Sequence, residues 1–107
     1  MSTEIKNPKA GSIILIVKGT TELSEDELTK IAKGRAPQFA AIPGLLQKYY
    51  IKTENPGEFG GVYIWDSMES LKEYKESELA ATIGKAYKLT GPPSLEVVNI
   101  MFELRDQ

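Results

Sequence analysis

The stretch GLLQKYYIKTENPGEFGGVYIWD, residues 44–66, decides how we interpret the rest of the chain. Its two ends, residues 45–52 and 61–65, are rich in Tyr, Ile, Val and Trp, which suit a half-buried strand. The polar segment between them, residues 53–60, contains Asn, Pro and Gly, which commonly form turns. The stretch therefore predicts a β-hairpin with a loop longer than the minimum.

The segment before the hairpin predicts one strand and one helix. Residues 12–18 include five consecutive apolar side chains, which is typical of a strand buried on both faces. Ser24 and Glu27 have the spacing of a capping box, so we expect a helix there, with Pro37 breaking or kinking its last turn. The inward face of this helix is expected to carry Leu28, Ile31, Ala32, Arg35 and Phe39.

The segment after the hairpin predicts a helical region and a last strand. Asp66 and Glu69 again have capping-box spacing, and a second helical piece is expected over residues 78–89. The Gly-Pro-Pro sequence at residues 91–93 would stop it, and residues 94–104 predict a long strand. The order of elements is therefore β-α-β-β-α-β.

This order predicts an α+β fold, a ferredoxin-like sandwich in which the helices cover one face of an antiparallel sheet. The first strand is then central, in agreement with its unbroken apolar run. Because the strands are apolar on both sides, the uncovered face would be a large apolar patch on a monomer. We expect a second copy to cover it, sheet to sheet around a two-fold axis. The alternative is that the N-terminal tail or the extra helix covers it.

Length and charge limit the classes of function. The chain has 107 residues, the size of one domain, which we expect over residues 12–107 after a flexible tail at 1–11. A net charge of −2 with scattered basic residues argues against nucleic acid or an anionic membrane as partner. Since no apolar run suits a membrane span or a signal peptide, we expect a cytoplasmic protein.

Cysteine and histidine are both absent from the sequence. Their absence excludes disulfides, Cys/His zinc sites, thiolate nucleophiles, Ser-His-Asp triads and histidine-ligated haem. No spacing typical of a carboxylate metal site occurs either, so we expect neither a metal nor a cofactor. Any chemistry then depends on Tyr, Trp, Asn, Arg, Lys or carboxylate groups, or on the substrate itself.

Three features of the sequence resemble one family. They are Pro43-Gly44-Leu45, the hairpin ending Gly60-Gly61-Val62-Tyr63-Ile64-Trp65, and Asp66-Ser67 before a Glu-rich helix. Over most of residues 12–104 the chain resembles the YdhR-type putative mono-oxygenases of the dimeric α/β-barrel superfamily. The resemblance implies a homodimer and a cofactor-independent reaction of O₂ with a small aromatic quinol or anthrone-like molecule. The lack of His departs from the superfamily's His-dependent members.

Candidate site residues are those expected between the helices and the sheet. Asn99 shares a strand face with Leu95, Val97 and Met101, so we expect it to be buried, as a donor to a substrate oxygen or as a satisfied core or dimer-interface amide. The catalytic candidates are Asn99, Trp65 and Arg35, and the substrate-binding candidates are Tyr63, Phe39, Tyr50 and Tyr74. The competing interpretation of the aromatic residues is core packing. For Arg35 the competing interpretation is that it pairs with a carboxylate or reaches the surface. Lys48, which alternates with Leu46 and Tyr50, is interpreted as a guard against edge pairing.

Three functions stay open at this point. The first is the mono-oxygenase that the resemblance implies. The second is a non-catalytic small-molecule-binding or stress-response homodimer with the same pocket. The third is a small isomerase or lyase acting on a carbonyl compound, which would need a carboxylate or a lysine with a shifted pKa facing the cavity.

Overall fold

The computed structural model describes residues 12–105, so the tail expected at residues 1–11 lies outside the described residues. The elements are β1 (Ile13–Thr20), α1 (Glu25–Ala40), β2 (Leu45–Lys52), β3 (Glu58–Trp65), α2 (Met68–Lys75), α3 (Glu78–Ala81), α4 (Ile83–Ala86) and β4 (Ser94–Asn99). This order confirms the predicted succession of strands and helices. The hairpin is also confirmed, with a shorter loop than expected because β3 begins at Glu58.

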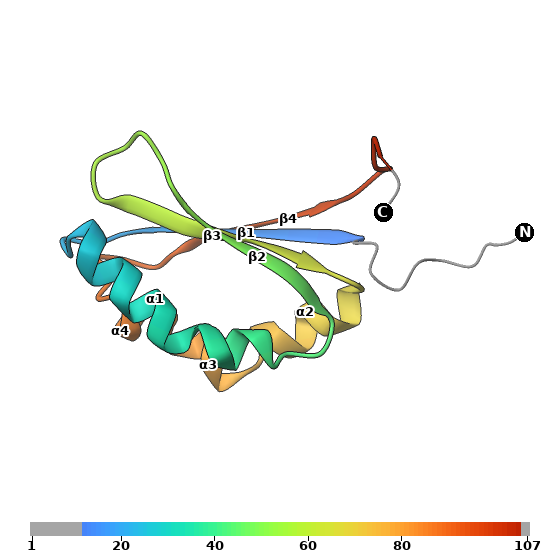
Figure 1. Cartoon of the computed structure of the whole chain (residues 1–107), viewed down its shortest axis with the longest axis horizontal. Coiled ribbons are helices and arrows are strands. Elements are labelled where there is room, and N and C mark those ends of the chain that lie inside the picture. Colours follow the sequence, from blue (N-terminus) through green and yellow to red (C-terminus); the bar gives the residue numbers. More distant parts are fainter. Residues whose placement is uncertain (1–11, 106–107) are drawn as a thin grey trace, which may run out of the picture.

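The four strands form one antiparallel sheet in the order β2-β3-β1-β4. The helices lie together on one side of this sheet (Figure 1). The predicted ferredoxin-like α+β fold is therefore confirmed, including the central place of the first strand. β2 and β4 are the two edge strands.

The register of the strands decides which residues face the helices. In β1, Ile13, Leu15 and Val17 are buried under the helical layer. Trp65 and Tyr63 of β3 lie opposite Ile13 and Leu15, so they share this inner face. The inner face therefore carries the core.

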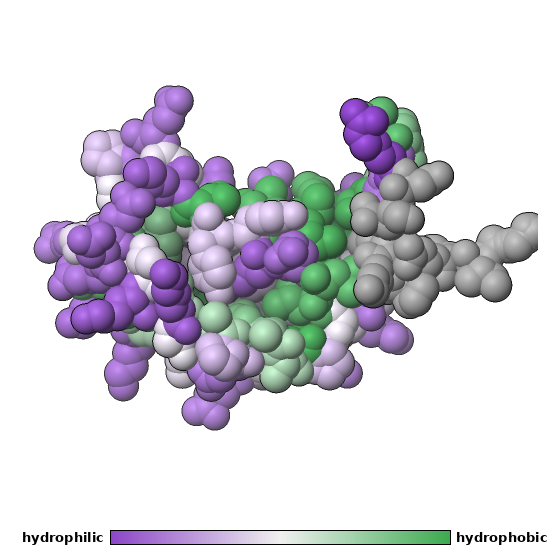
Figure 2. Space-filling view, viewed as in Figure 1, coloured by the Kyte–Doolittle hydropathy of each residue, from purple (hydrophilic) through white to green (hydrophobic). Residues whose placement is uncertain are grey.

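The opposite side of the sheet, which we call the outer face, has no helix over it. Its apolar strand residues, at least partly exposed in the chain taken alone, are Ile14, Ile16, Tyr49, Ile51, Val62, Ile64 and Val98, and it also carries the polar residues Lys18, Gln47 and Glu96. Figure 2 shows hydrophobic residues along the upper side of the molecule, over the sheet. An apolar sheet face of this kind is typical of a protein interface.

The helix ends follow the predicted signals in one case and depart from them in another. Ser24 caps α1 in a complete capping box with Glu27, as predicted. The cap of α2 is Ser67, one residue after the predicted Asp66, and its hydroxyl accepts from the Ser70 amide at 3.2 Å. Asp66 instead accepts a hydrogen bond from the Ser70 hydroxyl at 2.7 Å. Ser67 has the extended backbone that is typical of an N-cap residue.

Two predicted boundaries were wrong, whereas α1 ends at Ala40 as expected, with Pro37 inside the helix. The helical piece expected over residues 78–89 is split into the short α3 and α4. β4 ends at Asn99 instead of residue 104, at the point where it pairs with Ile13, the first residue of β1.

No helix within the described residues is both long and apolar enough to cross a membrane.

Candidate functional site

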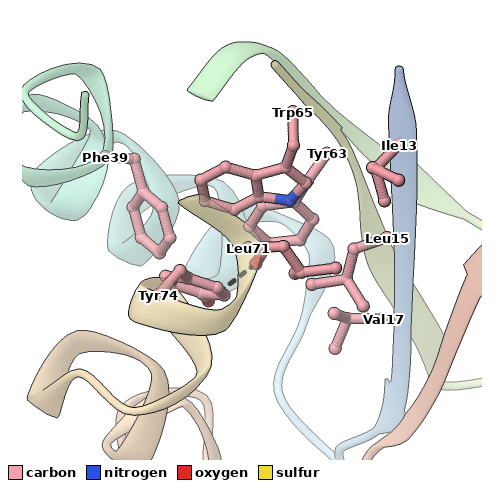
Figure 3. Packing of buried hydrophobic residues seen from close by; sticks show 8 residues of the cluster. All are labelled: Ile13, Leu15, Val17, Phe39, Tyr63, Trp65, Leu71 and Tyr74. Carbon is pink, nitrogen blue, oxygen red and sulfur yellow. Dashed lines mark hydrogen bonds between the residues drawn. The ribbon is translucent and has the colours of Figure 1, made fainter. Parts of the chain in front are cut away.

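A cluster of aromatic side chains fills the space between α1, α2 and the inner face of the sheet (Figure 3). The rings of Tyr63 and Trp65 are nearly parallel, with centroids 6.2 Å apart, and Tyr74 packs against both. The hydroxyls of Tyr63 and Tyr74 are 3.3 Å apart and form a hydrogen bond. Phe39 of α1 closes the cluster, with its ring centroid 6.1 Å from each tyrosine ring.

Lys48 of β2 places a cation against this cluster. Its register partner is Tyr63, so its side chain lies on the inner face. Its Nζ atom is 3.4 Å from the centroid of the Phe39 ring and 4.5 Å from those of Tyr50 and Tyr63. Within residues 12–105 it forms no ion pair, the single salt bridge there being Lys52–Glu25 on the surface. Ring faces, not carboxylates, therefore surround this amine.

Burial changes the acidity of this lysine. Removal from water, together with the nearby positive charge of Arg35, lowers the pKa of Lys48 from 10.5 to about 7. The three aromatic rings act in the opposite direction, since their negative faces favour the protonated amine. An amine with this pKa exists in both protonation states near neutral pH, which is what a group that accepts or donates protons requires.

Gly61 provides the room that Lys48 occupies. It lies on the inner face of β3 opposite Tyr50. A Cβ atom at this position would stand 3.1 Å from Lys48 Cε and 3.1 Å from Tyr63 Cε1, closer than most real contacts. The absence of a side chain at Gly61 therefore leaves space beside the amine.

Two hollows with common lining residues lie near Lys48, which lines the inner one. The inner hollow has a volume of about 30 Å³ and is lined by Val17, Gly19, Lys48, Tyr50, Phe59, Gly60, Gly61, Tyr63, Ile83, Tyr87, Leu89 and Pro93. The outer hollow has a volume of about 180 Å³ and is lined by Glu25, Leu28, Thr29, Ala32, Tyr50, Ile51, Lys52, Phe59, Gly60 and Tyr87. Tyr50, Phe59 and Tyr87 line both, so the two hollows share a wall.

A third hollow of about 280 Å³ lies between α2, the short helices and β4. Tyr74 and Leu95 line it, together with Val17 and Ile83, which also line the inner hollow. It has no strongly polar side chain other than Lys75 among its lining residues. The inner hollow with Lys48 is therefore the site with the clearest chemical character.

Arg35 joins α1 to the short helices. Its Nη2 atom donates to the Leu79 carbonyl at 3.1 Å and to the Thr82 hydroxyl at 3.5 Å. Its Cζ atom lies 5.8 Å from the Phe39 ring centroid and 5.9 Å from that of Tyr87. The expected carboxylate partner is thus replaced by a backbone carbonyl and a hydroxyl. The guanidinium acts on the inner hollow through its charge.

The tyrosines around this site are held in their neutral form. Burial raises the pKa of Tyr63 far above its usual value, and the neighbouring Tyr74 raises it further. Burial also raises the pKa of Tyr50, Tyr74 and Tyr87. At neutral pH these phenols are therefore hydrogen-bond donors and not bases.

The structure gathers some of the predicted site residues and separates others. Tyr63 and Tyr50 line the inner hollow, and Phe39 lies under the Lys48 amine. Tyr74 lines the third hollow. Trp65 is fully buried in the core at 0% exposure and lines none of the three hollows described above.

Asn99 lies on the predicted face of β4 but is not buried. Its backbone pairs with Ile13 on the inner side of the edge strand β4, as the alternation predicted. The prediction that Asn99 is buried was wrong for the single chain, in which it is exposed. The reason is that the helices do not extend over this edge, where Leu95 and Val97 are also exposed.

Lys48 is the residue that sequence reasoning missed as a site candidate. β2 is an edge strand, as the interpretation of Lys48 as an edge guard assumed, but the lysine points under the helical layer. The signal was its alternation with Tyr50, which put both side chains on the same face of the strand. Within residues 12–105, no cluster of His, Cys, Asp or Glu could hold a metal ion.

Comparisons with known proteins agree with this fold. No curated protein sequence matches the chain. NE2512 of Nitrosomonas europaea, a protein of unknown function, is similar with a TM-score of 0.72 at 19% identity, covering 91% of this chain and 96% of its own. SnoaB of Streptomyces nogalater, a cofactor-independent oxygenase, has a TM-score of 0.71 at 12% identity, covering 91% of this chain and 100% of its own.

A third solved structure has a TM-score of 0.69 at 20% identity, covering 86% of this chain and 92% of its own. It is described as a putative antibiotic biosynthesis monooxygenase of Caulobacter crescentus. At such identities these likenesses establish the fold alone. The family description "Putative mono-oxygenase ydhR" matches residues 14–99, which is most of the sequence, and the chain therefore belongs to that family.

Proposed function

We propose that this chain is a cofactor-independent mono-oxygenase that acts on a small aromatic quinol or anthrone-like substrate bound between the helices and the sheet. Membership of a mono-oxygenase family and the fold shared with an oxygenase support the reaction class. The observation that carries the proposal is the Lys48 amine, which lines a hollow with Tyr50 and Tyr63 and packs against the ring of Phe39. It is the general base that such a reaction needs.

The proposed reaction starts with proton transfer. The free amine of Lys48 accepts the proton of an acidic C–H or O–H bond of the substrate, and the ammonium that forms stabilises the resulting anion. The anion gives one electron to O₂, and the two radicals combine to form a C–O bond. The ammonium returns its proton to the peroxide, and loss of water leaves a carbonyl. One oxygen atom thus enters the product and the other leaves as water.

The remaining site residues have supporting roles in this proposal. Tyr63 and Tyr50 line the inner hollow and stay protonated; the Tyr50 hydroxyl is available as a donor to a substrate oxygen, whereas the Tyr63 hydroxyl is hydrogen-bonded to that of Tyr74. The ring of Phe39 packs against the Lys48 amine. Arg35 strengthens the positive potential of the inner hollow. Asn99 and Trp65, our other catalytic candidates, keep their roles only if substitution affects turnover.

The active form in this proposal is a homodimer whose outer faces pack together. The outer face carries apolar side chains from each of the four strands, beside the polar Lys18, Gln47 and Glu96, and has no helix over it. After β4, Met101, Phe102 and Leu104 are also exposed, Met101 at 90%. A second copy would bury all of these side chains. Light scattering should give twice the mass of one chain at micromolar concentration, and a monomer would contradict this part of the proposal.

A carbonyl isomerase or lyase is the second candidate, because it requires a lysine of shifted pKa facing the cavity, and Lys48 meets that requirement. It differs from the oxygenase in using no O₂. Proton exchange into a cyclic ketone, followed under argon, would support this candidate when the same protein consumes no O₂.

The test of the proposed function is O₂ uptake by metal-stripped protein with a panel of hydroquinones and anthrones. Lys48→Met removes the base, and Lys33→Met removes an exposed lysine of α1 as a matched control. We expect uptake above the uncatalysed rate in the parent protein and in Lys33→Met, and none above that rate in Lys48→Met. Asn99→Ala is expected to keep its uptake, because Asn99 lines none of the three hollows around the core.

Each outcome of this assay has a defined meaning. Equal uptake in the parent and in Lys48→Met would refute the role of Lys48 as base. Loss of uptake in Asn99→Ala or in Trp65→Phe, with the fold intact, would restore our sequence-based assignment of those residues. Absence of uptake across the panel, combined with thermal stabilisation by the same compounds, would favour the non-catalytic binding protein.

A further inference from the structure

We propose that the two adjoining hollows form one binding site for a single-ring aromatic anion, with the ring in the outer hollow and the charged oxygens in the inner hollow against Lys48. This inference rests on the proposed function in taking this space as the substrate site, and it narrows the class of substrate. It is argued from charge, from volume and from the shape of the shared wall.

The charge of the inner hollow has no counter-ion in the part of the chain that the structure describes. Lys48 Nζ and Arg35 Cζ lie 3.4 and 5.8 Å from the same Phe39 ring centroid, so two cationic groups share one aromatic surface. Neither forms an ion pair within residues 12–105. Arg35 at least donates to a carbonyl and a hydroxyl, whereas Lys48 has only ring faces. A buried cation is costly unless paired, so an anion is the ligand that this hollow favours most.

The volumes of the hollows determine the size of that anion. At about 30 Å³ the inner hollow has room for two or so water-sized groups, which is the size of a carboxylate or of a phenolate oxygen with a water. At about 180 Å³ the outer hollow is close to the cavity of about 150 Å³ that is known to bind benzene. One six-membered ring therefore fits, whereas the three fused rings of an anthrone do not fit without movement of the protein, so the inference narrows the proposed substrates to single-ring quinols.

The shared wall suits a flat ring. Phe59 and Tyr87 are in contact, with centroids 5.1 Å apart, and they line both hollows with Tyr50. Gly60 also lines both, so no side chain from that position separates them. Lys52 and Glu25, which line the outer hollow at the surface, form a salt bridge of 2.9 Å, so their charges balance each other. The site is thus open, aromatic along its length and positive at its inner end.

The charged and titratable groups facing Lys48 come from every neighbouring element. Arg35 of α1 is permanently positive. Tyr50 of β2, Tyr63 of β3 and Tyr87 after α4 are phenols whose pKa burial raises, so they stay neutral. Lys48 is then the one group of this set that changes its charge near neutral pH. An anion bound beside it must draw a proton onto its amine.

Calorimetric titration with benzoate and benzamide tests the inference, since the two share the ring and differ in charge. Benzoate should bind the parent protein about ten- to a hundredfold more tightly than benzamide, as expected for one charge-assisted hydrogen bond. At pH 7 its binding should take up about half a proton, seen as a dependence of the heat on the ionisation enthalpy of the buffer. Lys48→Met should bind both ligands equally weakly, and Lys33→Met should match the parent.

Lys48→Arg provides a second variant that keeps the charge. It should retain benzoate binding without proton uptake, because a guanidinium stays protonated throughout the range. Equal affinities for benzoate and benzamide, no benzoate binding at millimolar concentration, or unchanged binding in Lys48→Met would each overturn the inference. This result is independent of the oxygenase assay. Benzoate can bind with proton uptake when no O₂ is consumed, and O₂ can be consumed when benzoate does not bind.

Discussion

The partly buried amine of Lys48 should make the stability of this protein depend on pH in an unusual range. An unfolded lysine has a pKa near 10.5, whereas burial lowers the pKa of folded Lys48 to about 7. Between these values the unfolded chain binds more protons than the folded one. The free energy of unfolding must therefore rise as the pH increases from 7 towards 10. This gain in stability is lost again as the pH falls from 10 to 7.

The size of the effect follows from the shift. Each pKa unit corresponds to about 1.4 kcal/mol, and proton release on folding is about half complete at pH 7 and nearly complete at pH 9. Lys48 alone then contributes a rise of about 2 kcal/mol between these two pH values. The rings of Phe39, Tyr50 and Tyr63 hold the amine protonated to a higher pH, which reduces the rise to about 1 to 2 kcal/mol. For a domain of this size, about 1 kcal/mol changes Tm by roughly 4–8 °C.

Urea unfolding at pH 7 and pH 9, at one fixed protein concentration, measures this rise. Higher pH is avoided because burial raises the pKa of the folded tyrosines. Near pH 10 the phenols of the unfolded chain ionise first, which lowers the free energy of unfolding and opposes the effect of Lys48. Lys48→Met should abolish the rise and be at least as stable as the parent at pH 7, because it replaces a buried charge with an apolar chain of similar length. Lys33→Met should keep it. An equal rise in the parent and in Lys48→Met would refute the reasoning.

Three further substitutions test neighbouring features. Gly61→Ala adds a methyl group 3.1 Å from Lys48 Cε, so it should cost about 1 kcal/mol of unfolding free energy and weaken benzoate binding, as measured by urea unfolding and by titration. Arg35→Met removes the charged hydrogen bond to the Leu79 carbonyl, which keeps only the Thr82 hydroxyl as a side-chain donor, and should cost about 1–3 kcal/mol. Removing this positive charge should also raise the pKa of Lys48, so the increase in unfolding free energy should begin at a higher pH. An increase over the same pH range as in the parent would show that the two charges do not interact. Ser24→Ala breaks the capping box of α1 and should cost about 1 kcal/mol in thermal unfolding, a smaller change than Arg35→Met.

The fold was predictable because its signals are local and repeated. The apolar run of β1, the capping box at Ser24 and the hairpin around Gly57 each depend on residues close together in the chain, and together they leave one common topology. The errors occurred where a distant segment decides the outcome. β4 ends at Asn99, where it pairs with the first residue of β1, which nothing within residues 94–104 indicates. The exposure of Asn99 likewise depends on how far the helices extend over the sheet.

The position of Lys48 shows most clearly why the site itself was harder to predict. Leu45 pairs with Trp65, but the next pair is Gln47 with Ile64, so β2 contains one extra residue between them. In a strand that alternates strictly from an inward Leu45, position 48 would face outward, away from the helices. The bulge reverses this and turns Lys48 inward, onto the rings of residues 39, 50 and 63. A one-residue irregularity in an edge strand therefore places the amine in the cavity, and bulges are common next to functional sites because they redirect a side chain in this way.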